Sequence, residues 1–569
     1  MSGMRTGGQV LVDALKSHGV DMAFAVPGES YLAVLDALHD ASNQIRLITC
    51  RQEGGAAYMA EAYGKLTGKP GICLVTRGPG ASNATVGLHT AFQDSTPMIL
   101  LIGQVARDQA EREAFQEVDF RRLFGQVTKW TAQIEDARRI PEYMSQAFHR
   151  AVNGRPGPVA LALPEDMLTD LVAVKDAGHY VTARGNPSAE QIAELRDRLA
   201  KAKRPFVILG GGSWDQQAVA DIQVFAEDNN LPVGAAFRCQ DYFDNDHKNY
   251  AGDVGIGINP KLGERVKNAD LLLVVGARLG EMTTSGYTLL EPPVPQMDLV
   301  HVHASPEELG RVYQAALPIN SGMQGFARMV RAMKPVDHSA WDAETRAARA
   351  EYEAWQKHDA NAGAVQMGEI LAYLRGKLPK DAIITNGAGN YATWWHRFYR
   401  WRSYRTQLAP TNGSMGYGVP AGVAAKLVHP DRIVVSVNGD GCFLMNGQEI
   451  ATAVQHNANV IFIVVNNGMY GTIRMHQERE YPGRVSGTDL KNPDFAALAR
   501  AYGAHGETVK ETLEFAPAFE RCLKAGKPAL IEIQLDPEAI TPRLGLSQIR
   551  ANAQKSHAEK SPANKSGAK

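Results

Sequence analysis

Cysteines and long apolar runs are scarce in this 569-residue chain. Its five cysteines lie far apart, and no two of them form a CxxC pair. Widely separated thiols argue against a disulfide framework and a zinc site, and they favour a reducing, cytoplasmic location. No apolar run is long enough to cross a bilayer. We therefore expect neither a disulfide-stapled domain nor a membrane-spanning segment.

An excess of charge of either sign is also absent. The formal net charge is −1, with 60 basic and 61 acidic residues interspersed along the chain. Such a balance offers no electrostatic basis for binding nucleic acid or an anionic membrane. The first residues, MSGMRTGGQVLVDALKSHGV, have the pattern of an amphipathic helix and not of a signal peptide. The 44% hydrophobic content is that of an ordinary globular protein.

Short apolar runs alternate with helical stretches in three successive segments. This alternation predicts an α/β protein with three doubly wound parallel-sheet domains. A charged helical stretch predicts an exposed linker, and the polar, basic C-terminal stretch predicts a disordered tail. The expected boundaries are 1–175, 190–335 and 366–545 for the domains, 336–365 for the linker and 546–569 for the tail.

The stretch from 439 to 467 places an acid and an asparagine pair at the ends of two apolar runs. IVVSV precedes Gly439-Asp440-Gly441, and VIFIVV precedes Asn466-Asn467, with a helical pattern between them. Two strands joined in this way lie parallel in one sheet, and ligands bind beyond the carboxyl ends of such strands. We therefore expect Asp440 and the asparagine pair to converge on one ligand.

The chemistry of these residues suits magnesium and a diphosphate. Gly439 and Gly441 allow a bulky group to approach the backbone. A carboxylate and an amide oxygen are hard ligands, which Mg²⁺ combines with phosphate oxygens. The alternative is an ordinary Gly-Asp turn, which the ordered strand, helix, strand and Asn-Asn make the less favoured interpretation.

A second constellation lies in the first segment. Glu53 follows the strand-like IRLITC and begins a helix rich in Ala and Gly. Taken alone, a carboxylate at this position favours a simple interaction with the helix N-terminus. The following GPGASN stretch, which includes Asn83, either cradles phosphate or turns the chain.

Together, GDG-x24-NN, RQEGGAAYMAEAYG and GPGASN resemble the thiamine diphosphate-dependent decarboxylases and carboligases over about residues 5 to 545. Within this family, AFQEVDF and TNGSMGYGVPAGVAAKL are most similar to the acetolactate (acetohydroxyacid) synthase catalytic subunits. The resemblance implies decarboxylation of pyruvate or another 2-oxo acid, followed by condensation with a second carbonyl compound. It also implies a homodimer or homotetramer with active sites shared between subunits. A small regulatory subunit is a further partner that the resemblance allows.

The resemblance further implies roles for individual residues. Asp440, Asn467 and the carbonyl of Met469 would hold Mg²⁺. Glu53 would bond the pyrimidine ring of the cofactor and promote loss of its reactive proton.

Two residues of NGSMGYG would contact the same cofactor. The backbone of Gly413 would bond the pyrimidine, and Met415 would support the bent cofactor from below. The alternative for Met415 is an ordinary core residue.

Three further residues are candidates for the catalytic site, and two of them carry an alternative. Phe115 and Gln116 match a pair that lines the synthase site, and the alternative for Phe115 is a core residue at a helix start. Glu29 stands where decarboxylases often have an acid and synthases have glycine. It is either a proton donor or a helix cap.

Other positions depart from the synthase pattern. Glu165 replaces a lysine, and His476 replaces a tryptophan that shapes the pocket. Arg278 in GARLGEM is kept, but the acidic pair after it is lost. The central domain is therefore expected to bind FAD, another nucleotide or nothing.

These departures keep other functions open. One alternative is a non-oxidative 2-oxo acid decarboxylase, or an acyloin or 2-hydroxyacyl-CoA lyase of the oxalyl-CoA decarboxylase type. A non-catalytic cofactor-binding homologue is a third. Intact Glu53, Met415, Asp440 and Asn467 argue against that last alternative.

Overall fold

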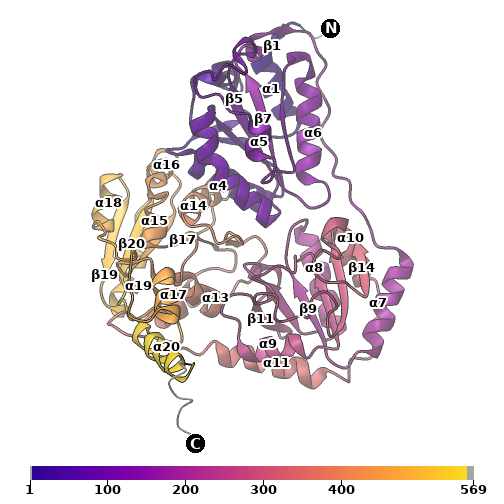
Figure 1. Ribbon diagram of the computed structural model, residues 1–569, viewed down its shortest axis with the longest axis vertical. Helices are drawn as coiled ribbons and strands as arrows, with labels where there is room; N and C mark the ends of the chain where they lie inside the picture. The colour runs from indigo at the N-terminus through magenta and orange to yellow at the C-terminus, as the bar shows by residue number, and fades with distance from the viewer. Residues whose placement is uncertain (1–2, 561–569) are drawn as a thin grey trace, which may run out of the picture.

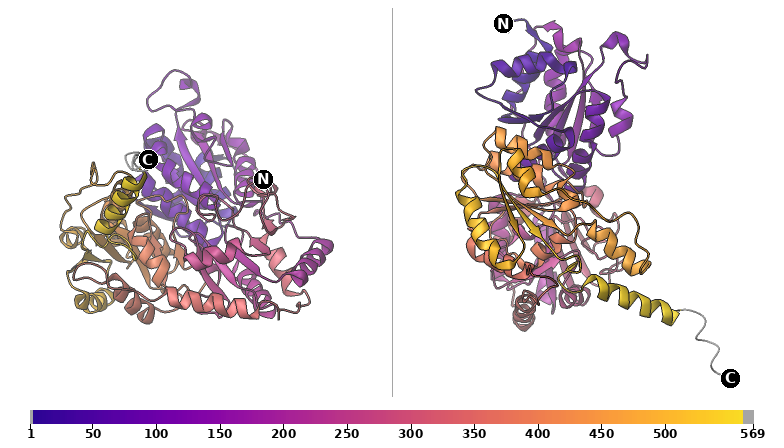
Figure 2. Two further views of the ribbon diagram at one scale, coloured as in Figure 1. Left: turned by 60° about the horizontal axis from the view of Figure 1, so that its bottom comes forward. Right: turned by 90° about the vertical axis from the view of Figure 1, so that its left-hand side faces the viewer.

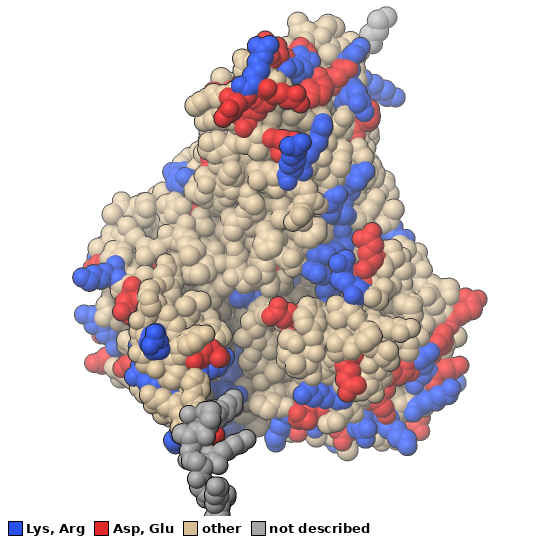
Figure 3. Space-filling view, viewed as in Figure 1, with Lys and Arg blue, Asp and Glu red and all other residues tan. Residues whose placement is uncertain are grey.

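The computed structural model describes residues 3–560, which form three domains, each built on a parallel six-stranded sheet (Figure 1). The predicted α/β class is confirmed. The N-terminal domain lies at the top of Figure 1, with the C-terminal and central domains side by side below it. No helix of residues 3–560 is long and apolar enough to cross a membrane. Basic and acidic side chains are mixed over the face drawn in Figure 3.

The N-terminal sheet has the strand order β3-β2-β4-β5-β7-β6. Its strands are β2 (Met22–Ala25), β3 (Arg46–Thr49), β4 (Gly71–Val75), β5 (Met98–Gln104), β6 (Trp130–Gln133) and β7 (Pro158–Pro164). Its helices are α1 (Gly7–Ser17), α2 (Leu32–Asp40), α3 (Glu53–Thr67), α4 (Gly78–Asp94), α5 (Phe120–Phe124) and α6 (Ile140–Val152). A short antiparallel pair joins β1 (Arg5–Thr6) to β8 (Leu171–Val172).

The central sheet has the order β11-β10-β9-β12-β13-β14. Its strands are β9 (Pro205–Leu209), β10 (Val233–Ala236), β11 (Tyr250–Val254), β12 (Leu271–Val275), β13 (Asp298–His303) and β14 (Leu317–Asn320). Its helices are α7 (Ala189–Lys201), α8 (Gln216–Asp228), α9 (Pro260–Lys267) and α10 (Met323–Arg331).

The stretch predicted as an exposed linker contains helix α11 (Asp342–Trp355), which packs beside β11 and α9. The expected helix is present, and most of it is exposed or half-buried, but one face is buried. Trp341 just before it is 1% exposed, and Ala348 and Tyr352 on one face are also buried. Apolar residues at helical spacing therefore attach this helix to the central domain, despite the charged residues between them.

The C-terminal sheet has the order β16-β15-β17-β18-β20-β19. Its strands are β15 (Ile383–Asn386), β16 (Gln407–Leu408), β17 (Val434–Gly439), β18 (Ile461–Asn466), β19 (His505–Val509) and β20 (Ala529–Gln534). Its helices are α12 (Met367–Lys377), α13 (Tyr391–Phe398), α14 (Gly418–Val428), α15 (Asp440–Phe443), α16 (Ile450–Gln455), α17 (Gly471–Glu480), α18 (Phe495–Ala501) and α19 (Thr512–Lys524).

All three sheets reverse their strand order near the first strand of the domain. The reversal falls between β2 and β4, between β9 and β12, and between β15 and β17. In open parallel sheets, ligands bind beyond the carboxyl ends of the strands at this switch point. Each domain therefore presents one edge suited to a ligand.

The expected disordered tail, residues 546–569, is wrong for its first part. Residues 546–560 form helix α20 (Leu546–Lys560), and residues 561–569 lie outside the described part. Leu546 and Ile549 pack in a small apolar cluster against the loop that carries Met469. A few apolar side chains in a polar stretch are enough to dock this helix on the C-terminal domain, at whose edge it lies in Figure 2.

An ion pair between half-buried Arg550 and a buried carboxylate strengthens this docking. The guanidinium of Arg550 donates two hydrogen bonds, of 2.7 and 2.6 Å, to the Glu478 carboxylate on α17. Glu478 is 0% exposed, and the bond from Arg550 lowers the pKa of its carboxyl from 4.5 to about 2.

We predict that Arg550→Gln lowers the free energy of unfolding by about 1–3 kcal/mol at pH 7, because a buried carboxylate loses its main donor. A lowered folded pKa stabilises the fold above pH 4.5, and this contribution is lost as the pH falls toward 2. The difference between the proteins should therefore shrink over that range in urea unfolding. Lys555→Gln, an exposed change in the same helix, is the control. Equal stability of Arg550→Gln and the wild type at pH 7 would contradict the prediction.

Candidate active site

Asp440 lies at the switch point of the C-terminal sheet, where β17 ends. Its side chain is 3% exposed. Oδ1 accepts a hydrogen bond of 2.8 Å from the Gly441 N–H, and Oδ2 accepts one of 2.9 Å from the Gly468 N–H. Burial raises the pKa of the Asp440 carboxyl, while these donors act in the opposite direction. The carboxylate is thus fixed in orientation between the two loops.

The asparagine pair follows the neighbouring strand, as predicted. Strands β17 and β18 are parallel, with Gly439 paired to Val465, so Asp440 and Asn466 leave the sheet at the same edge. Asn466 donates to the Glu532 carboxylate on β20 at 2.7 Å, and its Oδ1 accepts from the Gly468 N–H at 3.2 Å. Asn466 therefore supports the loop that carries Asn467 and Met469.

Asn492 belongs to the same cluster and was missed in the sequence. Its side-chain N–H₂ donates to Asp440 Oδ2 at 2.7 Å and to Asn466 Oδ1 at 2.8 Å. It lies in a loop between α17 and α18, with no strand before it. Tertiary folding alone brings Asn492 to the edge of the sheet beside Asp440, so the hydrophobic periodicity of the sequence gave no signal for it.

The donor chemistry of this edge fits a hard cation that shares its ligands with a phosphate. Asp440, the Asn467 amide and the Met469 carbonyl offer oxygens only. Residues 3–560 contain no group of three or more His, Cys, Asp and Glu side chains placed to hold a metal. One carboxylate with neutral oxygens is typical of Mg²⁺ sites and is unlike zinc sites.

The segment from 410 to 416 lies beside the turn that follows Asp440, where the Gly416 N–H donates to the Cys442 Sγ at 3.2 Å. Gly413 has φ +69°, and a Cβ there would meet no atom within 4 Å, so a ligand can approach its backbone. Met415 is half-buried and packs against the C-terminal core, and its carbonyl accepts from the Tyr58 hydroxyl at 3.2 Å. Its contact with a cofactor stays a prediction.

Glu53 is the first residue of α3, at the carboxyl end of β3. The Asn83 side chain donates to its Oε2 at 2.9 Å. The Gly-Pro-Gly stretch before Asn83 is not a free loop, because it forms the first turn of α4. A Cβ at Gly80 would lie 3.3 Å from Glu53 Oε1, so the glycine lets α4 begin close to this carboxylate.

Glu449 holds the turn that presents Glu53, and it too was missed. This residue of the C-terminal domain is 0% exposed. Its carboxylate accepts from the backbone N–H groups of Arg51 and Gln52, at 3.0 Å each, and from the Thr452 hydroxyl at 2.6 Å. A Cβ at Gly55 would lie 2.6 Å from Glu449 Oε1, so the glycine permits this close approach. The position of Glu53 therefore depends on a contact between domains.

Four other predicted residues gather at the same N-terminal edge. Gln116 has φ +65°, its carbonyl accepts from the Gly78 N–H at 3.0 Å, and its Oε1 is buried with no partner within residues 3–560. Phe115 is 73% exposed, so the alternative of a core residue is wrong for this chain alone. Glu29 is exposed in a short 3₁₀ turn, and Glu165 forms an ion pair with Arg77.

Arg278 and Gly413 line a cavity of about 930 Å³ where the three domains meet. Gly211 and Gly276, after β9 and β12, have φ of +75° and +76° and stand at the switch point of the central sheet. A Cβ at Gly211 would lie 1.9 Å from the Gly276 carbonyl oxygen, so the two loops pack directly against each other. Arg278 donates to the Glu308 carboxylate at 3.3 Å. His476 is exposed on α17 and is not in the cavity wall, although Thr472 one turn earlier is.

Comparison with known proteins agrees with this geometry. Three sequence-family models of thiamine pyrophosphate enzymes match: the N-terminal TPP binding domain at 5–123, the central domain at 192–330 and the C-terminal TPP binding domain at 387–533. The acetolactate synthase isozyme 2 large subunit of Escherichia coli is 31% identical, over 93% of this chain and 95% of its own length. The acetolactate synthase large subunit of Corynebacterium glutamicum is 30% identical, over 94% and 87%.

We predict that Glu449→Ala lowers the free energy of unfolding by about 2–5 kcal/mol, because two backbone N–H groups lose their acceptor. Glu449→Gln keeps one acceptor oxygen and should cost less. Hydrogen exchange at the amides of Arg51 and Gln52 should accelerate in the alanine variant. Glu480→Ala, an exposed change, is the control. Unchanged exchange at Arg51 and Gln52 would contradict the role given to Glu449.

Proposed function

This chain belongs to the thiamine pyrophosphate enzymes, and we propose that it is a thiamine diphosphate- and Mg²⁺-dependent carboligase of the acetolactate synthase kind. It would decarboxylate pyruvate or another 2-oxo acid and join the remaining fragment to a second carbonyl compound. The observation that carries this proposal is the buried Asp440 carboxylate, fixed beside the Asn466–Asn467 loop at a sheet switch point.

The C-terminal edge would hold the diphosphate end of the cofactor. Asp440, Asn467 and the Met469 carbonyl would bind Mg²⁺, and Gly439 and Gly441 would let the diphosphate approach the backbone. When bound, thiamine diphosphate supplies a carbon nucleophile for the 2-oxo group and accepts the electron pair left by departing CO₂.

The N-terminal edge would serve the other end of the cofactor. Glu53 would hold a proton at the pyrimidine ring, and the 2.9 Å bond from Asn83 would fix the orientation of its carboxylate. Gln116, with its buried free oxygen, and exposed Phe115 would line the reacting end. Gly413 and Met415 would position the ring between the two edges.

We further propose that each site is shared between two subunits of a homodimer or homotetramer. The hydrogen-bond partner of the Glu53 side chain lies in the N-terminal domain, and those of the Asp440 side chain lie in the C-terminal domain. No hydrogen bond within residues 3–560 joins Glu53 and Asn83 to Asp440 or to the partners of the Asp440 side chain. An exposed Phe115 also suits cover by a second copy. Because these relatives are named as large subunits, we include a smaller regulatory partner subunit in this proposal.

The central domain would bind a nucleotide, with FAD as the candidate that the resemblance gives. Gly211 and Gly276 at the switch point and the adjoining cavity support this proposal. Flavin absorbance of the protein purified without added cofactor tests it.

One observation favours a second candidate, a 2-oxo acid decarboxylase. Glu29 is an exposed acid on the same sheet edge as Glu53, where it could protonate a product instead of leaving it to attack a second carbonyl. The acyl-CoA lyases are a variant of this candidate, and turnover of acyl-CoA substrates would favour them.

Product analysis by NMR tests the reaction directly. With pyruvate, thiamine diphosphate and Mg²⁺, we expect acetolactate to accumulate, and we expect none when either cofactor is removed. Accumulation of acetaldehyde instead would favour the decarboxylase. Absence of any turnover across a panel of 2-oxo acids and acyl-CoA compounds would contradict both.

Mixing two inactive variants tests the shared site. Glu53→Gln should lower turnover about 10²–10⁴-fold, the range of a general acid–base group. Asp440→Asn should abolish activity through loss of Mg²⁺. After co-refolding, a mixed dimer would contain one site with both carboxylates. An equal mixture should therefore regain about a quarter of the wild-type activity. No recovery, or an active monomer in sedimentation, would contradict shared sites.

A further inference from the structure

The segment from 409 to 413 contains no helix or strand, so its position depends on the side chains around it. It lies between β16 and α14 of the C-terminal domain, and residues 411–413 line the cavity where the three domains meet. Most of the side chains that form hydrogen bonds with it belong to the N-terminal domain. The central domain adds Arg238, which donates to the Pro410 carbonyl. A loop that belongs to one domain is therefore held mainly by another.

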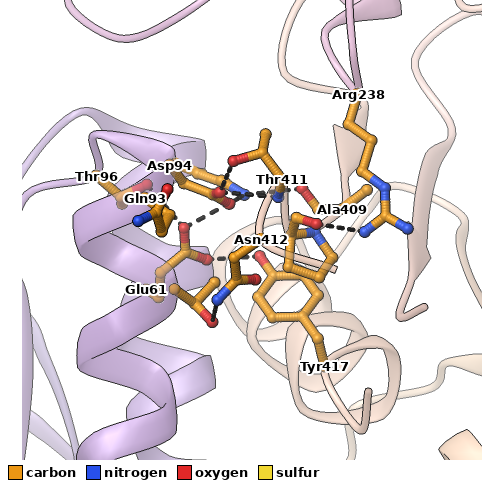
Figure 4. Close-up of polar contacts among 12 residues, drawn as sticks. Glu61, Gln93, Asp94, Thr96, Arg238, Ala409, Thr411, Asn412 and Tyr417 are labelled. Carbon is orange, nitrogen blue, oxygen red and sulfur yellow. Dashed lines mark hydrogen bonds and ion pairs between the residues drawn. The ribbon is translucent and has the colours of Figure 1, made fainter. Parts of the chain in front are cut away.

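Asp94, the last residue of α4, is the centre of this contact. Its side chain is 1% exposed. Oδ1 accepts two hydrogen bonds from Thr411, one of 2.8 Å from the backbone N–H and one from the hydroxyl (Figure 4). Oδ2 pairs with the Lys65 ammonium, which also donates to the Ala409 carbonyl at 3.0 Å. Asp94 and Lys65 thus hold the chain on both sides of Pro410.

Lys65 serves two buried carboxylates at once. Glu61, one turn earlier on α3, lies 3.3 Å from its Nζ, and Asp94 lies closer still. Burial lowers the pKa of the Lys65 ammonium, but Asp94 and Glu61 more than offset this effect and raise it above its usual value of 10.5. Lys65 is therefore charged at neutral pH, and it keeps Glu61 as a counter-charge if Asp94 is removed. The fold should thus survive the loss of the Asp94 carboxylate.

The held segment ends in a turn at Gly413, whose backbone a ligand can approach. The Gly413 N–H donates to the Pro410 carbonyl at 3.0 Å, which closes a turn over 410–413. Thr411 is the second residue of this turn, so its bonds to Asp94 fix the direction in which the turn ends. The Gly413 carbonyl has no hydrogen-bond donor within residues 3–560. A ligand that bonds this carbonyl must supply the donor, as an amino group does.

We propose that Asp94 is a positioning residue, which holds this turn so that the Gly413 carbonyl can accept a hydrogen bond from the pyrimidine amino group of the cofactor. This inference rests on the proposed thiamine diphosphate site. Asp94 would not touch the cofactor and would act through Thr411. Without the contact to Asp94, the cofactor would have to order the turn as it binds, and that ordering reduces affinity.

The diphosphate end of the site offers an internal comparison. The hydrogen-bond donors to the Asp440 side chain come from Gly441, Gly468 and Asn492, and none of them belongs to the 409–413 segment. Loss of the Asp94 carboxylate should therefore weaken the hold on the pyrimidine and leave the diphosphate edge unchanged. A general loosening of the fold would instead weaken both ends.

Hydrogen exchange of the full chain without added cofactor tests the hold on the turn. Asp94→Ala should speed exchange at the amides of Thr411 and Gly413 about tenfold or more, because the turn loses its main acceptor. Asp94→Asn keeps one acceptor oxygen for Thr411 and should lie between the alanine variant and the wild type. Asp40→Ala, an exposed change at the last residue of α2, is the control. Unchanged exchange at Thr411 in the alanine variant would overturn the inference.

Calorimetry with Mg²⁺ present separates a positioning role from a merely structural one. We expect thiamine diphosphate to bind about 10- to 100-fold more weakly to Asp94→Ala than to the wild type. Inorganic diphosphate, which lacks the pyrimidine, should bind both proteins equally. An equal loss for the two ligands, or a loss for neither, would overturn the positioning role. If the wild type binds neither ligand, the proposed function fails, whereas the exchange result still decides whether Asp94 holds the turn.

Discussion

The packing of α3 against α14 is the contact on which the rest of the molecule depends. The two helices meet within one apolar core that spans the N- and C-terminal domains and includes the small side chains of Ala56 and Ala57 on α3. The contact also contains a buried acid. Glu61 is 0% exposed and accepts from the Tyr417 hydroxyl at 2.6 Å and from the Thr96 hydroxyl at 2.7 Å (Figure 4). Burial raises the pKa of Glu61, whereas the Lys65 ammonium at 3.3 Å and these two hydroxyl donors act in the opposite direction.

Helix α3 joins this packing to the chemistry of the site. It begins with Glu53, whose approach is fixed by Glu449. One turn later, Tyr58 contacts the Met415 carbonyl. A shift of α14 against α3 would therefore move Glu53 and the segment that carries Met415 together. Buried polar groups tolerate such shifts poorly, because each unsatisfied donor or acceptor carries a large cost.

Much of the site could be predicted because it follows strand ends. Asp440 and Asn466 end parallel neighbours, and period and spacing are enough to place them on one edge. Asn492 and Glu449 could not be found in this way, because a loop residue and a residue of another domain reach the site only through tertiary packing. Helix α20 was missed for a related reason. Its few apolar side chains gain their stability from the surface beneath them and not from the local pattern.

The docking of α20 also sets an order for assembly during synthesis. The apolar cluster that steadies the loop of Met469 includes Leu546 and Ile549, which follow the other elements of the C-terminal domain along the chain. Domains fold as they leave the ribosome, N-terminal first. The N-terminal and central domains can therefore fold while the chain is still attached to the ribosome. The loop of Met469, in contrast, gains this support only after the segment from residue 546 onward has been made.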